Sequence, residues 1–200
     1  MRVMMPHHYF SVHFKPYKRQ PQLASMGQIT NWFKANKPTN KQPITALFAA
    51  ASNGHCVVPS NYELATDNSF RFVSSSLIMI DVDDDNQAIN PYEVLHTLHG
   101  CCGLFYTFSH GKKGNRYRLV FQLDRAITED AALYKLVVEC LIDDILKQLP
   151  ILADAIDTKV KSPTAPARTS SRRCCPVRWP RVVLRTSRWP SSPVACSTGA

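Results

Sequence analysis

The 200-residue sequence predicts an α+β fold in which a mostly antiparallel sheet packs against helices. Three observations indicate this class. Residues 70–83 form a long apolar and β-branched segment that is typical of a strand. Two further strand-like segments are joined by the glycine- and lysine-rich turn at 111–115, which predicts an antiparallel hairpin. Residues 129–149 carry apolar side chains at helical spacing.

The N-terminal part predicts one strand and two short helices. The strand covers YFSVHF at residues 9–14. The helices cover residues 26–37 and 43–52, where apolar residues recur at three- and four-residue intervals. Trp32 and Phe33 fall on the apolar side of the first helix, and we interpret them as core residues.

A short helix and the hairpin follow the long strand. NPYEVLHTLHG at 90–100 has Asn90 in the capping position and Gly100 at the expected end of the helix. CGLFYTFSH and RYRLVFQLD, residues 102–110 and 116–124, predict the two strands of the hairpin. This order of elements gives the sheet its expected antiparallel character.

The clearest helix of the chain is expected over residues 129–149. Thr128 is the predicted cap, and Pro150 ends the helix. Its apolar residues share one face and are expected to form the buried stripe. They are Leu133, Leu136, Val137, Cys140, Leu141 and Ile145.

The formal net charge of +9 comes from residues 161–200. This segment holds one lysine and seven arginines without an acid, which leaves 16 basic and 15 acidic residues in 1–160. Overall basicity is therefore a weak argument for nucleic-acid binding. The segment is rich in proline, serine and arginine and is expected to be a disordered tail. Our preferred hypothesis is that it was translated in a shifted reading frame, so that the natural domain is cut short, and the coding DNA can test this.

Seven cysteines occur without a CxxC pair, which argues against a disulfide scaffold or a zinc ribbon. The residues His96, His99, Cys101 and Cys102 are a weak zinc candidate, because adjacent cysteines suit one tetrahedral ion poorly. No signal peptide or membrane-length apolar stretch is present. We therefore expect a cytoplasmic protein with reduced thiols and no membrane partner.

An acidic cluster ends the long strand in the sequence LIMIDVDDDN. Asp81 and Asp83 lie two positions apart, so both side chains point to the same face of the strand. Two carboxylates so close repel unless a cation neutralises them, and hard oxygen ligands suit Mg²⁺ or Mn²⁺. The alternative is a solvated acidic turn, to which we assign Asp84 and Asp85.

The hairpin gathers polar and basic residues suited to phosphate. Guanidinium groups bind phosphate bidentately, and two of the arginines share one strand face. The alternative is a charged hairpin tip that faces solvent. The candidates are Ser109, His110, Lys112, Lys113, Arg116 and Arg118.

The sequences IDVD at 80–83, YTFSHGKKGNRYRLVF at 106–121 and AID at 155–157 together resemble the archaeo-eukaryotic-type primase superfamily, especially phage and plasmid replication primases. The family has an hDhD motif on a strand, a second motif on the following hairpin and a later hD motif. The resemblance covers roughly residues 60–160. It implies an RRM-like catalytic core, incomplete over 61–160, with residues 1–60 as an N-terminal segment of the same domain.

The resemblance also implies roles for individual residues. Asp81, Asp83 and Asp157 would be the catalytic residues that hold Mg²⁺ or Mn²⁺. The hairpin candidates would contact an NTP or dNTP, with single-stranded DNA as template and a replicative helicase as a possible partner. The family's second motif commonly has a histidine where Arg118 stands, so either His110 or Arg118 takes that role.

Three other functions remain compatible with these residues. One is another Mg²⁺-dependent enzyme, such as a nuclease or a DxD transferase, which would use the same acid pair. Another is a non-catalytic nucleic-acid-binding replication module. The last is an inactive, truncated primase remnant.

Overall fold

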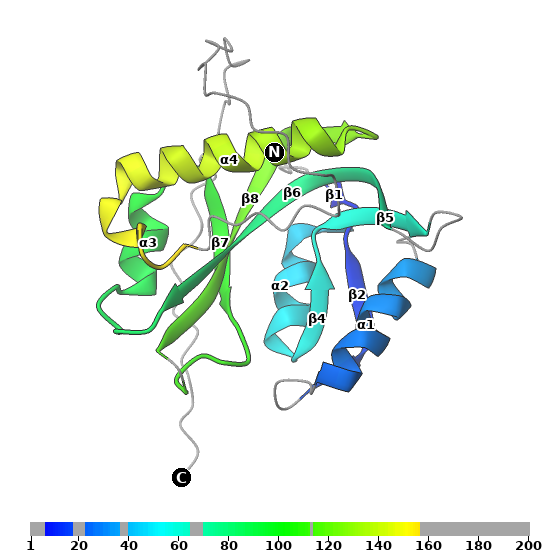
Figure 1. Ribbon diagram of the computed structural model, residues 1–200, viewed down its shortest axis with the longest axis horizontal. Helices are drawn as coiled ribbons and strands as arrows, with labels where there is room; N and C mark the ends of the chain where they lie inside the picture. The colour runs from blue at the N-terminus through cyan, green and yellow to red at the C-terminus, as the bar shows by residue number, and fades with distance from the viewer. Residues whose placement is uncertain (1–6, 18–22, 37–39, 65–69, 113, 157–200) are drawn as a thin grey trace, which may run out of the picture.

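The structure, a computed structural model, describes residues 7–17, 23–36, 40–64, 70–112 and 114–156. It has the α+β class that the sequence predicts, with antiparallel sheets and packed helices (Figure 1). The helices are α1 (Leu23–Ala35), α2 (Ile44–Ser52), α3 (Pro91–Thr97), α4 (Ala131–Gln148) and the 3-10 turn η1 (Pro150–Leu152). The strands are β1 (His7–His8), β2 (Ser11–Pro16), β3 (Gln42–Pro43), β4 (His55–Val58), β5 (Ser60–Leu64), β6 (Phe70–Asp84), β7 (Cys101–Tyr106) and β8 (Asn115–Thr128).

The main sheet has four antiparallel strands in the order β5-β6-β8-β7. Its two central strands, β6 and β8, are also its longest, with 15 and 14 residues. Because side chains alternate along β6, Ile78, Ile80 and Val82 pack into the core with α4. Leu77 points to the other face and packs with residues of α2 and the N-terminal strands. Helices and short strands therefore cover both faces of the sheet.

The N-terminal elements form two small antiparallel pairs, β1–β3 and β2–β4. They share a core with the sheet, in which Phe10 and Leu47 pack with Leu77 and Val120. Sequence analysis missed β1, β3, β4 and β5, which have two to five residues each and are too short for a periodic signal. Figure 1 shows α1, α2, β2 and β4 grouped beside the lower half of β6.

The loops around α3 and β7 differ in part from the expected ones. Asn90 caps α3 as predicted, since its side chain accepts a hydrogen bond from the Tyr92 amide at 3.0 Å. The helix ends at Thr97, three residues before the expected Gly100. Strand β7 ends at Tyr106, so the turn before β8 is longer than the predicted 111–115. The predicted tail, residues 161–200, lies outside the described residues.

The buried face predicted for α4 is correct for Ile145, Val137 and Leu141 and wrong for the first turns of the helix. Asp130, not Thr128, caps the helix by accepting a hydrogen bond from the Leu133 amide at 2.8 Å. Leu133 and Leu136 are 44% and 48% exposed. The helix buries Val138 and Ile142, which were not predicted, together with the predicted Ile145. Apolar residues occur nearly all round this helix, so the sheet against which it packs, and not the periodicity, selects the buried face.

The packing of α4 predicts that two substitutions in this helix lower the free energy of unfolding by different amounts. Ile142→Ala is expected to lower the free energy of unfolding by about 2–4 kcal/mol, because it leaves a cavity against the sheet. Leu136→Ala is expected to cost less than about 1 kcal/mol, because its side chain is half exposed. Urea denaturation measures both. Equal costs for the two variants would contradict the observed packing of α4.

The chain leaves α4 and η1 and returns to the sheet at the acid-bearing end of β6. The Asp83 amide donates a hydrogen bond to the Ala155 carbonyl at 2.7 Å, and Ile156 forms an antiparallel bridge with Val82. Strand β5 pairs only with the first part of β6, so this contact occupies the edge of β6 beyond it. In the part of the chain that the structure describes, no helix is both long enough and apolar enough to cross a membrane.

Candidate functional site

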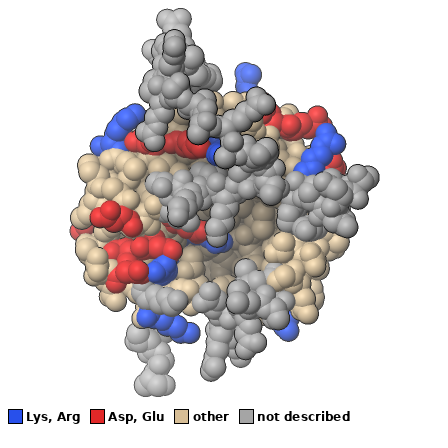
Figure 2. Space-filling model, in the orientation of Figure 1, with Lys and Arg blue, Asp and Glu red and all other residues tan. Residues whose placement is uncertain are grey.

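A cavity of about 740 Å³ lies between the main sheet and the elements α1, α2 and β4. Figure 2 shows a hollow between these two parts, with acidic side chains gathered near the end of β6. The sheet side of the cavity is charged, whereas α1 and β4 add mostly apolar and small polar side chains. The lining residues are Ile29, Thr30, Phe33, Ala51, Ser52, His55, Cys56, Val57, Val58, Asp81, Asp83, Phe105, Tyr106, Thr107, Phe108, Ser109, Arg116 and Arg118.

Asp81 and Asp83 both line this cavity. Their side chains are 50% and 48% exposed, whereas Val82 between them is fully buried on the other face. The expected shared face is therefore confirmed, and its cause is the two-residue period of β6. The carboxylates have the partial access to solvent that a ligand-binding group needs.

Each carboxylate is paired across the strands with an arginine. The register sets Asp81 opposite Arg118 and Asp83 opposite Arg116. The Arg118 Nε and the Arg116 guanidinium make ion pairs with these respective partners. A further contact joins Arg118 to the second Asp81 oxygen at 3.4 Å. The two like-charged carboxylates are thus neutralised by protein cations.

Arg116 is the more deeply held of the two arginines. Its side chain is only 16% exposed, and it also pairs with Asp85. Desolvation by burial works to lower the pKa of Arg116, but hydrogen bonds and charges from Asp83 and Asp85 outweigh it and raise that pKa. The guanidinium is therefore a permanent cation in the floor of the cavity.

The acidic turn is only partly as predicted. Asp84 is buried, with 5% of its surface exposed, on the opposite face from Asp83. Its carboxylate accepts hydrogen bonds from the Ile89 amide at 2.9 Å and from Asn115 Nδ2 at 3.4 Å. The assignment of Asp84 to a solvated turn is therefore wrong, because this carboxylate fixes the loop before α3. Asp85 is exposed, as expected, and binds Arg116.

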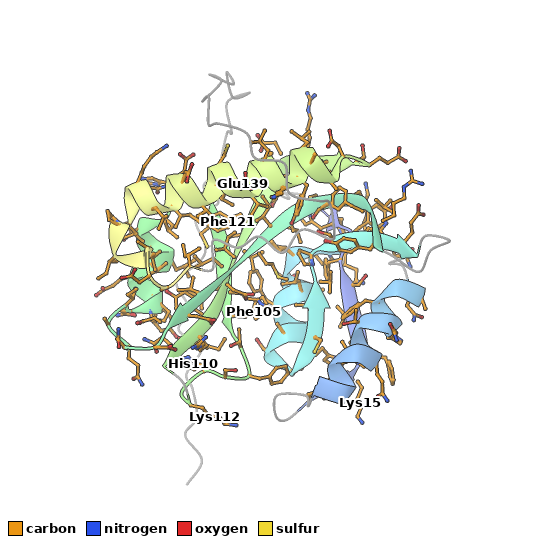
Figure 3. The ribbon with its side chains drawn as sticks, viewed as in Figure 1. Lys15, Phe105, His110, Lys112, Phe121 and Glu139 are labelled. Atoms are coloured by element: carbon orange, nitrogen blue, oxygen red, sulfur yellow. The ribbon has the colours of Figure 1, made fainter. Side chains whose placement is uncertain are left out.

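The hairpin candidates separate into two groups. Ser109, Arg116 and Arg118 line the cavity. His110 is outside the lining: its Nδ1 accepts the Arg116 amide at 3.3 Å, and its ring stacks on Tyr106 with centroids 4.0 Å apart. Lys112 is exposed at the end of the turn, and Figure 3 shows it pointing away from the sheet. Arg118, and not His110, therefore lies in position to contact a ligand in the cavity.

Two of the predicted residues are not described. Lys113 and Asp157 both lie outside the described residues. The described chain ends at Ile156, which is the residue bridged to Val82 between the two cavity carboxylates.

Comparisons with known proteins add no family to this geometry. No protein-family model, no curated protein and no solved structure matches the chain. The functional conclusion therefore depends on the cavity and on its carboxylate–arginine pairs.

Sequence analysis missed the residues that α1 and β4 bring to the cavity. The clearest is His55, whose Nδ1 lies 2.7 Å from the His13 carbonyl oxygen. A carbonyl only accepts, so Nδ1 is the nitrogen that donates. Cys56 and Thr30 lie in the same lining. No local motif marks these residues, since tertiary packing alone brings them to the acids.

The donor types at the cavity fit a hard divalent cation. Asp81 and Asp83 offer carboxylate oxygens, and Mg²⁺ is commonly held by one or two carboxylates together with substrate phosphates and water. In the described ranges no three or more His, Cys, Asp or Glu residues gather as a metal-binding group. This includes the weak zinc candidate, where burial raises the pKa of Cys101 to about 11 and so keeps its thiol protonated.

Proposed function

We propose that this chain carries the catalytic core of a DNA-dependent primase, a nucleotidyltransferase that makes primers in phage or plasmid replication. One observation carries the proposal: two carboxylates alternate on one strand opposite two arginines on the next, all facing one cavity. Carboxylates that can hold Mg²⁺ or Mn²⁺ and guanidinium groups that can bind phosphate are the two halves of a nucleotidyl-transfer site. The cavity volume of about 740 Å³ suits a nucleotide-sized ligand.

The carboxylates are the proposed metal ligands. Asp81 and Asp83 would hold Mg²⁺ or Mn²⁺, which as a Lewis acid stabilises the negative charge that develops on phosphate. The half-exposed side chains allow this, because neither carboxylate must leave the protein interior to reach a ligand. The proposal treats Asp157 as the third ligand. This role rests on the sequence resemblance, since the described chain ends one residue earlier, at Ile156.

The arginines are the proposed triphosphate ligands. Without substrate, Arg116 and Arg118 neutralise the carboxylates. Arg116 and Arg118 would bind phosphate oxygens of an incoming NTP or dNTP, and Asp81 and Asp83 would then hold the divalent cation in place of the arginines. Charge therefore stays balanced in both states, which avoids leaving two anions unpaired in the cavity. Ser109 lines the same cavity and would add a hydroxyl to the phosphate contacts.

The finer fold assignment belongs to the same proposal. A four-stranded antiparallel sheet with α3 and α4 against one face is compatible with an RRM-like primase core. The acids then lie at the end of the central strand β6, and the arginines on its central neighbour β8. The partners implied are a single-stranded DNA template and a replicative helicase.

Primer synthesis tests the proposal directly. The full chain is incubated with a single-stranded circular DNA, labelled NTPs or dNTPs, and Mg²⁺ or Mn²⁺. Template-dependent oligonucleotides are the expected product, and reactions without template or with excess chelator are expected to yield none. Cleavage of the template without synthesis of new strands would indicate a nuclease instead of a primase. Transfer of label to an acceptor that is not a nucleic acid would indicate a DxD transferase.

A second candidate function, a non-catalytic nucleic-acid-binding replication module, is favoured by the same ion pairs. Both carboxylates already have cationic partners within the protein, so their pairing serves stability without any metal. If the chain binds DNA but makes no primers with either Mg²⁺ or Mn²⁺, the result would support this candidate. The same result would also support an inactive primase remnant. Chain stability separates the last two, since a remnant with an incomplete core is expected to unfold at low denaturant.

A further inference from the structure

Five aromatic rings form a cluster beside the cavity. We call the side chains of His13, Phe14, Tyr17, Trp32 and Phe33 the aromatic cluster. His13 is at its centre, with ring centroids 4.7 Å from Phe14 and 4.8 Å from Trp32. Phe14 and Trp32 are 5.9 Å apart, and Trp32 and Phe33 are 5.2 Å apart. Strand β2 and helix α1 together position these rings.

The cluster is not a closed core. His13 is buried, with 4% of its surface exposed, but Phe14 is 70% exposed, the most exposed large apolar side chain among the described residues. Trp32 and Phe33 are half-buried and belong to neither apolar core, which corrects their interpretation as core residues. The rings of His13 and Trp32 contact Phe14, and the exposed part of its ring presents an apolar surface to solvent.

The charge around the cluster is positive. Lys15 is exposed next to Phe14, and its ammonium lies 5.9 Å from the Tyr17 ring centroid. Figure 3 shows Lys15 beside α1. Strand β2 and helix α1 contain no acidic residue, and the sequence continues after Tyr17 with Lys18 and Arg19. An anionic partner is therefore favoured over a cationic one.

The aromatic cluster is continuous with the cavity. Phe33 belongs to both, and His55 of the cavity lining bonds the backbone carbonyl of His13 at the centre of the cluster. Phe33 and the His55–His13 hydrogen bond therefore connect the cavity to the cluster that contains Phe14. On the opposite wall the cavity is closed by the arginine-bearing strand β8.

We propose that the aromatic cluster is a base-stacking site for single-stranded nucleic acid, with Phe14 as its outermost platform. Its role as a template site rests on the proposed function, but its binding of a single strand does not. A flat ring stacks on any base because every base has a π face, and a neighbouring lysine contacts the phosphate beside it. Duplex DNA has its bases already stacked and is expected to bind this site more weakly.

Fluorescence anisotropy tests the site with the full chain, without metal or nucleotide. The probes are a labelled twelve-nucleotide oligothymidylate and the same backbone with abasic sugars. The assay is run at about 0.3 M salt to suppress charge-driven binding by the basic residues after 160. Phe14→Ala is expected to weaken oligothymidylate binding roughly tenfold and to leave abasic binding unchanged, whereas Phe14→Trp retains wild-type affinity.

Tyr92→Ala is the matched control. Tyr92 is an aromatic side chain 62% exposed on α3 and is not part of the aromatic cluster, so its removal is expected to leave both affinities unchanged. The proposal is overturned if Phe14→Ala binds oligothymidylate as wild type does, which would point to a protein partner for the cluster. It is also overturned if Phe14→Ala weakens binding of the abasic strand by the same factor. If single-stranded DNA binding depends on Phe14 but the chain makes no primers, the proposed function is contradicted and the stacking site is still supported.

Discussion

Replacing Asp83 with asparagine is expected to reduce primer synthesis by at least ~10³-fold, which corresponds to several kcal/mol of lost transition-state stabilisation. The amide has nearly the shape of the carboxylate but no charge, so it cannot neutralise a divalent cation. The fold should tolerate the change, because the side chain is half exposed and Arg116 keeps Asp85 as a partner. Labelled-nucleotide incorporation gives the rate, and Mn²⁺ titration gives the affinity for the cation.

Asp124→Asn is the control for this variant. Asp124 is an exposed aspartate on β8, the same strand that carries both arginines, but it is outside the cavity lining. Its incorporation rate and Mn²⁺ affinity are expected to stay within about twofold of wild type, since isolated surface charges contribute little. Equal incorporation by Asp83→Asn and wild type would reject the catalytic assignment of the acid pair.

The second large effect is expected at Gly114, in the turn before β8. This residue has φ +93, and a β-carbon there would meet the Asp84 carbonyl oxygen and lie 2.6 Å from the Asp85 Cα. Gly114→Ala therefore combines an unfavourable backbone conformation with a backbone collision. We expect it to lower the free energy of unfolding by about 2–4 kcal/mol, measured by chemical denaturation.

Gly111→Ala separates the two causes. Gly111 has φ +74 in the same turn, but a β-carbon there would meet no atom within 4 Å. Its replacement is expected to cost only about 1–2 kcal/mol, from backbone conformation alone. If the two alanine variants were equally destabilised, close packing of the turn against the acids of β6 would be excluded as the reason for glycine at 114.

The main strands and the shared faces of their charged residues were accessible from sequence because strand geometry leaves little choice. Side chains two apart on a strand must share a face, so Asp81 with Asp83 and Arg116 with Arg118 followed from spacing alone. The sequence did not reveal that the two pairs bind each other. That depends on the register between β6 and β8, which is a tertiary property.

Other features were out of reach for identifiable reasons. The buried face of α4 was predicted only in part, because apolar residues surround the helix and the packing of the sheet decides between its faces. His110 was a candidate from its predicted position at the end of a strand, yet the strand stops at Tyr106, and His110 stacks on that ring outside the cavity lining. His55 and Phe14 carry no local signature, since their neighbours come from distant segments.

The contact between Ile156 and Val82 has a practical consequence for anyone who engineers this protein. Only one peptide unit separates that contact from residues outside the described fold, and Ala155 is bonded directly to the backbone of an acid in the cavity. A purification tag or a fluorescent fusion joined at this junction would disturb the backbone contacts that hold the acid-bearing end of β6. Labels belong on the exposed start of α4 instead, across the sheet from the charged residues.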